Sequence, residues 1–350
     1  MTSTIEITCH RQHDAWQAKT MPPIEEIRPG LWSIPVPMPQ SPLRYTLVYA
    51  LVLPDGIALI DTGLDTDESW RALVEGIHAT GHDIPDVRYV AITHLHPDHF
   101  GLVPRLLEHA DVTLAMHRND ARFLRFHSDE EISREQDWAT TQLAQLGAPT
   151  DIPETGMHQF TRLPKGRTID VELDDNQPLG LPGWDVKALW TPGHTPGHLC
   201  LLDETAGTVF TGDHLLPRIS PNVSTSLFQP TDPLDAYLVS LAHTEHLPDV
   251  EALPSHEYRF RGLADRVTAL LSHHEERFDE IAAAVAADPQ ITAWDVARSV
   301  SWSRPFADLL IPLQRMAARE THAHLVVLEA RGILTHEGEL PQRWSVAAPA

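Results

Sequence analysis

The sequence is poor in cysteine and in long hydrophobic runs. Its 350 residues include only Cys9 and Cys200, too few and too far apart for a disulfide framework or a cysteine-based metal site. No stretch approaches the ~18 to 20 apolar residues that a membrane-spanning helix needs. Residues 1–20 lack the apolar segment after a basic start that marks a secretory signal. We therefore expect a cytoplasmic protein in a reducing compartment, with no membrane partner.

Basic residues are also scarce. The chain has 49 acidic residues against 26 Lys and Arg, which gives a formal net charge of -23. Such a charge repels phosphate backbones, so nucleic acid is an unlikely partner and a small-molecule substrate is favoured. The hydrophobic share of 42% and the charged share of 21% are ordinary for a globular protein. The length allows one large domain with a smaller one attached.

The first 262 residues alternate between strand-like and helix-like patterns. A hairpin is predicted over residues 44–61, a helix over 67–81 and a buried strand over 87–93. The alternation continues to about residue 256, which indicates a mixed α/β domain over 1–262. Within it, residues 118–166 contain more polar helix and loop than a connection needs. This insertion is either a pocket wall or a solvated excursion.

The last 88 residues, 263–350, change to helices without ligand-type clusters. A long amphipathic helix over 265–287 precedes a second helix that Thr292 caps. A third helix over 314–331 is followed by two short strands in 333–346. Three helices and a hairpin predict a small winged-helix-like C-terminal domain.

The richest local signal is the sequence "HLHPDHFG", which begins at His94. It places three histidines and Asp98 in six consecutive positions, as H-x-H-x-D-H. Pro97 favours an extended conformation for His96, so His94 and His96 can project from a tight loop toward one point. The pattern therefore predicts a metal-binding loop beyond the end of a strand.

Three further clusters also follow apolar strands: "TPGHTPGH" at 191–198, "TGDH" at 211–214 and "PSHE" at 254–257. Neutral imidazoles and carboxylates without thiolates suit Zn²⁺ and tolerate Fe or Mn. Two such ions held close together can share a bridging hydroxide that acts as a nucleophile near neutral pH. The clusters favour a hydrolytic metal site.

Together with Asp61 in "DTG", these motifs resemble those of metallo-β-lactamase fold hydrolases in order and approximate spacing over residues 30–260. The resemblance implies an αββα sandwich with a dinuclear zinc site at one edge. It implies two ligand sets: His94, His96 and His194 for one ion, and Asp98, His99 and His256 for the other, with Asp213 bridging them. Asp98 would also orient the attacking species. Asp61 would orient a ligating imidazole, and His198 would be a hydrogen-bonded supporting residue.

The C-terminal residues indicate which branch of this family the chain resembles. "ETHAHLVVLEARGIL" is similar to the winged-helix tail of the lactamase-β-2-like, glyoxalase II-like branch, which includes thioesterase-like and endoribonuclease-like members. Flavodiiron proteins, which reduce oxygen, have a carboxylate where this chain has His96, so hydrolysis is favoured. We expect a substrate that is a thioester, an ester or a lactone.

Two alternatives stay open at this point. The first is a metal-dependent endoribonuclease acting on single-stranded RNA, for which Arg118, Arg122 and Arg125 could form a basic patch. The second is a winged-helix nucleic-acid-binding protein with a vestigial site. Residues 263–350 contain 8 Arg and no Lys against 12 acids, so we expect them to form a pocket wall or a homodimer contact instead. Whether His214 or the insertion touches the substrate is also open.

Overall fold

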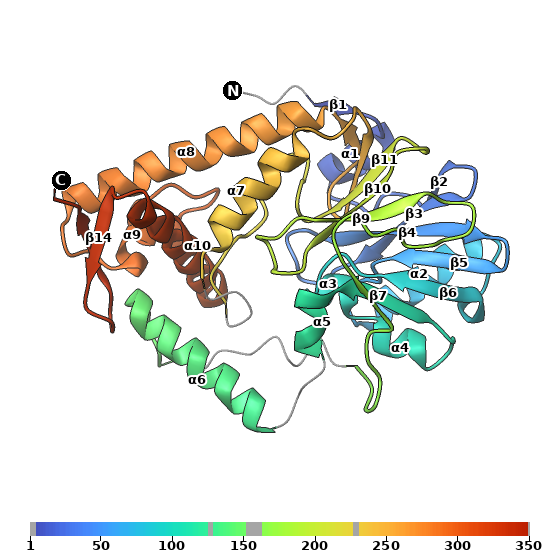
Figure 1. The fold of residues 1–350 in the computed structure, drawn as a ribbon, viewed down its shortest axis with the longest axis horizontal. Coiled ribbons are helices and arrows are strands. Elements are labelled where there is room, and N and C mark those ends of the chain that lie inside the picture. The colour runs from blue at the N-terminus through green and yellow to red at the C-terminus, as the bar shows by residue number, and fades with distance from the viewer. Residues whose placement is uncertain (1–4, 125–128, 152–162, 227–230, 349–350) are drawn as a thin grey trace. The chain divides into compact units, whose positions relative to one another are not determined.

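The computed structural model describes residues 5–124, 129–151, 163–226 and 231–348. The chain divides into two compact units, which are described separately (Figure 1). The first unit comprises residues 1–127, 157–221 and 240–267, and the second comprises 128–156, 222–239 and 268–350. The division predicted at residues 262 and 263 stays a prediction, and the second unit also takes in part of the predicted insertion.

Two sheets form the body of the first unit. The seven-stranded sheet has the order β2 (Glu25–Arg28), β3 (Leu31–Pro37), β4 (Tyr45–Leu53), β5 (Gly56–Ile60), β6 (Val87–Ala91), β7 (Thr113–His117) and β8 (Val171–Leu173). The six-stranded sheet has the order β1 (Glu6–Ile7), β13 (Phe260–Arg261), β12 (Glu251–Pro254), β11 (Thr208–Gly212), β10 (Leu199–Asp203) and β9 (Val186–Trp190). The hairpin predicted over residues 44–61 is the antiparallel pair β4 and β5.

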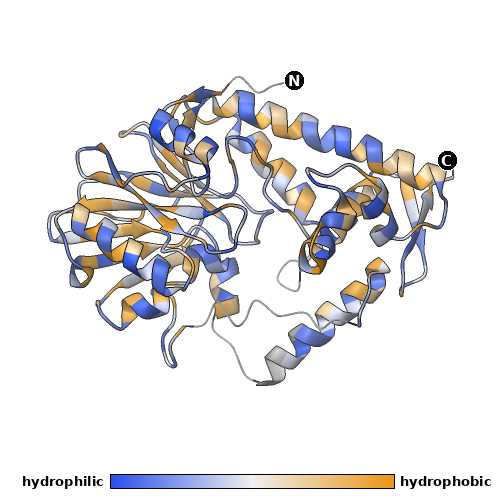
Figure 2. Ribbon diagram, turned by 180° about the vertical axis from the view of Figure 1, so that it is seen from behind, coloured by the Kyte–Doolittle hydropathy of each residue, from blue (hydrophilic) through white to orange (hydrophobic). Residues whose placement is uncertain are grey.

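The hydrophobic core lies between the two sheets. Alternate residues of β4, from Tyr45 to Leu53, belong to one buried cluster because side chains of a strand alternate between its faces. The other sheet contributes Leu201, Phe210 and Leu253 to the same cluster. Figure 2 shows that hydrophobic residues follow the strands of both sheets. The two sheets therefore form a sandwich.

Helices cover the outer face of the seven-stranded sheet. Helix α2 (Asp67–Ala79) packs on β3 so closely that a Cβ added to Gly76 would lie 2.1 Å from the Ile34 side chain. The other helices that begin in this unit are α1 (His10–Ala18), α3 (Pro97–Phe100), α4 (Val103–Leu107), α5 (Arg118–Leu124) and α8 (Leu263–Ala287). The predicted mixed α/β sandwich is confirmed.

The topology places the sequence motifs at strand ends. Strands β5, β6 and β7 run parallel in one sheet, and β11 and β12 run parallel in the other. In α/β sheets, ligand sites form at the carboxyl ends of parallel strands. Those ends, and the end of β9, carry the predicted site residues: Asp61 after β5, His94 to His99 after β6, His194 after β9, Asp213 after β11 and His256 after β12.

The second unit is mainly helical. Its elements are α6 (Asp129–Leu146), most of α7 (Pro233–Thr244), most of α8, α9 (Ala293–Ser299), α10 (Ile311–Ala330) and the hairpin of β14 (Leu334–Glu337) and β15 (Arg343–Val346). Thr292 caps α9 as predicted, because its side chain accepts a hydrogen bond from the Asp295 backbone N–H. The three predicted helices and the hairpin are present, whereas the winged-helix assignment stays a prediction.

One predicted helix begins at a different residue, and the predicted insertion contains two helices. Helix α10 begins three residues earlier than predicted, at Ile311, because Pro312 is tolerated in the first turn, where its missing N–H costs no hydrogen bond. The insertion predicted over residues 118–166 contains two helices, α5 and α6, and residues 125–128 between them lie outside the described part. Within the described ranges, no helix combines the length and apolar composition needed to cross a membrane.

Candidate metal centre

The structure brings all seven predicted ligands together. Three groups of side chains have ligand atoms within 4.8 Å of one another, and each predicted ligand belongs to at least one group. The groups are His94, His96 and His194; His94, His99 and Asp213; and Asp98, His99 and His256. The first and third groups match the two predicted ligand sets.

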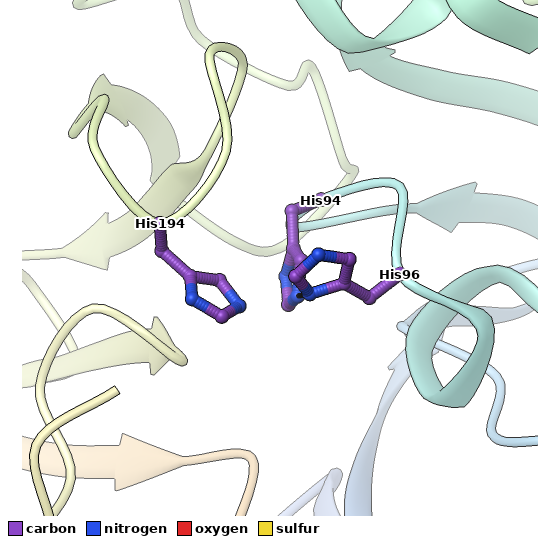
Figure 3. Close-up of side chains that lie close together, drawn as sticks. All are labelled: His94, His96 and His194. Atoms are coloured by element: carbon purple, nitrogen blue, oxygen red, sulfur yellow. Dashed lines mark hydrogen bonds between the residues drawn. The ribbon is translucent and has the colours of Figure 1, made fainter. Parts of the chain in front are cut away.

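The first group joins two loops. Figure 3 shows the rings of His94 and His96, from the loop after β6, converging with the ring of His194, from the loop after β9. His96 has the extended conformation expected before Pro97, with φ -64° and ψ 151°. Nε2 of His94 lies 3.0 Å from Nδ1 of His96. Burial lowers the pKa of His96 to about 3, which favours the neutral imidazole that a metal ligand requires.

The third group is oriented by hydrogen bonds on the far side of each imidazole. Nδ1 of His99 donates to Asp61 Oδ2 over 2.8 Å, and Nδ1 of His256 donates to the Tyr45 carbonyl over 2.9 Å. Ligating histidines are commonly held in this way by a carboxylate or a backbone carbonyl. The arrangement directs both Nε2 atoms toward Asp98, whose Oδ2 lies 3.5 Å from Nε2 of His99 and 3.3 Å from that of His256.

Asp213 faces both ligand sets. Its Oδ2 lies 3.5 Å from Nε2 of His194, and its Oδ1 lies 3.3 Å from Nε2 of His256 and 3.5 Å from Nε2 of His99. One carboxylate oxygen is thus directed to each side, which is the geometry that a bridging ligand needs.

The residues present fit a metal centre. Nε2 of His99, Nε2 of His256 and Oδ1 of Asp213 are buried, and none of them forms a hydrogen bond to any described residue. Buried polar atoms normally have partners, so three such atoms facing one another indicate an ion site. A donor set of imidazole nitrogen and carboxylate oxygen suits a divalent cation such as zinc.

The carboxylates and imidazoles of the site shift one another's pKa. Burial opposes charging of His256, but Asp213 and Asp98 outweigh it and raise the pKa of His256 to about 10. Burial also opposes ionisation of Asp98, yet His99 and His256 hold its pKa well below the ordinary value. Because the carboxylates stay ionised, they attract cations to this position.

His198 contacts the backbone of Asp213. Its Nε2 accepts a hydrogen bond of 3.1 Å from the Asp213 backbone N–H, and its Nδ1 lies 2.8 Å from Oγ1 of Thr191. The backbone donor at Nε2 means that Nδ1 carries the proton. A Cβ at Gly212, which has φ 51°, would lie 2.6 Å from Nε2 of His198, so this position requires glycine.

Three other buried histidines have different surroundings. His214 is buried, and its Nε2 lies 2.8 Å from Oγ1 of Thr244. His117 stacks on Trp190 with a ring separation of 5.1 Å, and Nδ1 of His274 lies 3.1 Å from Nε2 of His324. The neighbouring apolar side chains of Phe100 and Leu215 are fully buried.

Asp120 is a residue of this region that the sequence did not single out. It follows β7, is fully buried, and accepts hydrogen bonds from the loops that carry His94 and His194. The available signal was its position just beyond a strand parallel to β6, but an aspartate near a strand end is too common to stand out. Burial raises the pKa of Asp120 to about 6, against the opposing effect of its hydrogen bonds.

Comparison with known proteins agrees with this geometry. The family model described as the metallo-beta-lactamase superfamily matches residues 42–256. A Bacillus subtilis protein named probable metallo-hydrolase YqjP is 28% identical over 325 residues, which cover 87% of this chain and 93% of that protein. An Aspergillus fumigatus protein named atrochrysone carboxyl ACP thioesterase is 25% identical over 244 residues, but the match covers only 45% of its length.

Two solved structures share the fold over almost the whole chain. The metallo-beta-lactamase family protein TTHA1429 from Thermus thermophilus has a TM-score of 0.78 and 28% identity, and the match covers 92% of this chain and 100% of that one. A beta-lactamase domain protein from Burkholderia ambifaria has a TM-score of 0.80 and 27% identity, with 99% and 98% covered. The ligand clusters, the sandwich and these matches agree: the chain belongs to the metallo-beta-lactamase superfamily and is a metal-dependent hydrolase.

Proposed function

We propose that this protein is a dinuclear zinc hydrolase whose substrate is a small acyl compound, namely a thioester, an ester or a lactone. The observation that carries the proposal is the position of Asp213, with one carboxylate oxygen facing His194 and the other facing His99 and His256. This placement supports two ions rather than one. Fe or Mn in place of zinc would use the same nitrogen and oxygen donors.

The chemistry follows from the residues around the ions. When bound, two such ions make a water acidic enough to lose a proton near neutral pH and polarise a carbonyl oxygen. Asp61 and the Tyr45 carbonyl accept from Nδ1 of His99 and His256, so each ring would present Nε2 to an ion that displaces the proton from that nitrogen. The Asp98 side chain keeps 15% of its surface exposed, so its carboxylate can orient the attacking water.

The arginines that favoured a nuclease are engaged within the protein. Arg118 forms an ion pair with Asp174, and the guanidinium of Arg122 lies 4.6 Å from the ring centroid of Phe123. Arg125 lies outside the described residues. With a formal net charge of -23 for the whole chain, a polyanionic substrate is therefore disfavoured relative to an acyl compound.

Two arginines of α10, the third helix predicted in the C-terminal residues, also have partners within the protein. In the second unit, Arg315 is 2% exposed and donates to the Pro149 carbonyl, and Arg319 donates to Gln142 over 2.6 Å. These contacts support an architectural role for α10 rather than DNA reading. The role proposed for residues 263–350, as a pocket wall or a homodimer contact, remains open to test.

The test is a hydrolysis panel on zinc-loaded protein, with acyl thioesters, aryl esters, lactones and single-stranded RNA as substrates. We expect chelator-sensitive hydrolysis of at least one acyl class, and RNA cleavage that is slower and suppressed by modest salt. The Asp98→Asn variant serves as the negative control for the chemistry. Efficient RNA cleavage at physiological salt, with the acyl compounds untouched, would show the nuclease to be the correct function.

A further inference from the structure

We propose that Asp120 is a positioning residue that fixes the distance between the two loops supplying His94, His96 and His194, and thereby sets the affinity for the ion that these histidines hold. The inference rests on the metal centre of the proposed function but not on the identity of the substrate. Asp120 does not belong to any of the three ligand groups found among the described residues.

The carboxylate of Asp120 connects the two loops directly. Its Oδ2 accepts a hydrogen bond of 2.9 Å from the backbone N–H of Leu95, the residue between His94 and His96. The same oxygen accepts a bond of 2.8 Å from Oγ1 of Thr195, which is adjacent to His194. Oδ1 accepts a bond of 2.6 Å from the Gly197 backbone N–H.

All three partners are donors, so the chemistry of the side chain is specified. An ionised carboxylate accepts on both oxygens, whereas an asparagine has one oxygen and one NH₂ group. Asparagine could therefore satisfy Gly197, or Leu95 together with Thr195, but not both sides. On the remaining side, the NH₂ group of the asparagine would point at a backbone N–H group. Two donors cannot bond to each other, and the site is fully buried from water.

The fit around Asp120 leaves little freedom. A Cβ added to Gly197 would lie 2.6 Å from Oδ1 of Asp120 and 2.6 Å from its backbone nitrogen, so the second glycine of "TPGHTPGH" permits the close approach. The neighbouring Asn119 donates from Nδ2 to the Pro196 carbonyl over 3.3 Å, and Nε1 of Trp190 donates to the same oxygen over 3.0 Å. The loop of His194 is thus held on several sides.

The consequence is specific to one ion. His94, His96 and His194 come from loops after β6 and β9, which lie in different sheets, so strand pairing within one sheet does not set their separation. The Leu199 backbone N–H donates to the Thr93 carbonyl over 2.9 Å at the base of the two loops, and Asp120 adds the contacts next to the histidines themselves. The other set is oriented by different partners, Asp61 for His99 and the Tyr45 carbonyl for His256. Loss of the hydrogen bonds to Asp120 should therefore weaken binding of the ion that the three histidines hold, and it should leave binding of the other ion unchanged.

The experiment is a competition titration of Zn²⁺ against a chromophoric chelator, on metal-free full-length protein, together with the melting temperature of each metal-free variant. Asp120→Asn should reduce the affinity for one of two ions by about 10- to 100-fold, the range found when such supporting contacts are removed. In the double variant Asp120→Asn/His96→Ala, the ion that remains should bind as tightly as it does in His96→Ala alone. Asp203→Asn is the matched control, since Asp203 is also buried and accepts from the backbone N–H groups of Ala206 and Asp185.

The experiment distinguishes failure of this inference from failure of the proposed function. Asp203→Asn should lower the melting temperature without changing zinc affinity. Folded Asp120→Asn protein that binds both ions as tightly as the wild type, or that loses both equally, would overturn the inference. If Asp120→Asn does not fold, Thr195→Val decides, because it removes only one donor: unchanged affinity overturns the inference, and a smaller loss at one ion supports it. A wild-type protein that binds fewer than two ions contradicts the proposed function instead, and Asp120 is then judged on the ion that remains.

Discussion

Asp61 Oδ2 accepts a hydrogen bond of 2.8 Å from Nδ1 of His99, and both side chains are almost completely buried. The same carboxylate accepts from the backbone N–H and the hydroxyl of Thr93, the residue before His94. Asp61 adopts a left-handed conformation with φ 61°, which is uncommon for a residue other than glycine. The protein tolerates this conformation where it places a carboxylate behind His99 and beside the residue that precedes His94.

Asp61→Asn should therefore weaken metal binding while the fold persists. The asparagine oxygen can still accept from His99, but the negative charge behind the imidazole is lost. We expect zinc affinity to fall by about 10- to 100-fold, measured by chelator competition. Ser255→Ala is the comparison variant, since Ser255 contacts Asp61 only through a long hydrogen bond of 3.4 Å, and it should change affinity little. If Asp61→Asn binds zinc as tightly as the wild-type protein, Asp61 does not contribute to metal binding.

His96→Ala and Asp213→Ala remove ligands of different kinds. His96 belongs to one ligand group, so its loss should release one ion, whereas loss of Asp213 removes the carboxylate that faces both sets and should disturb both ions. Hydrolysis of the responsive acyl substrate should fall by orders of magnitude in each variant, with unchanged circular dichroism. His109→Ala is the control, because His109 is exposed and lies outside the ligand groups. Near-normal turnover in either ligand variant would place the chemistry elsewhere.

Thr292→Ala tests the second unit independently of the metal. It removes the side-chain oxygen that accepts from the Asp295 N–H at the start of α9, so the free energy of unfolding should fall by about 1 kcal/mol. The measurement is urea denaturation followed by circular dichroism. Thr140→Ala is matched to it, because Thr140 is exposed within α6 and its hydroxyl only donates back to the Gln136 carbonyl. If Thr140→Ala lowers the free energy of unfolding as much as Thr292→Ala does, loss of the helix cap does not explain the effect of Thr292→Ala.

The sequence predicted the features that depend on local pattern. The H-x-H-x-D-H motif, its extended His96, the Thr292 cap and the strand ends that bear ligands are each encoded within a few residues, and the structure has them in place. The wider resemblance supplied the grouping of His194, Asp213 and His256, which the motifs alone could not.

Contacts between distant segments were not predictable in the same way. The bridge from Asp120 to Leu95 and Gly197 depends on how two loops from different sheets meet. In the second unit, the bond from Arg319 of α10 to Gln142 of α6 joins residues 177 positions apart. No periodicity or cap encodes such a pairing, because it arises only when the elements are packed.

The most direct test of the account is the number of ions per chain. The purified protein would be stripped with a chelator, reloaded with zinc, freed of excess metal by gel filtration and analysed by elemental analysis against the protein concentration. Because Asp213 faces both ligand sets, we predict two zinc ions per chain in the wild type and one in His96→Ala. A wild-type protein that retains no more than one ion after careful loading would contradict the dinuclear centre.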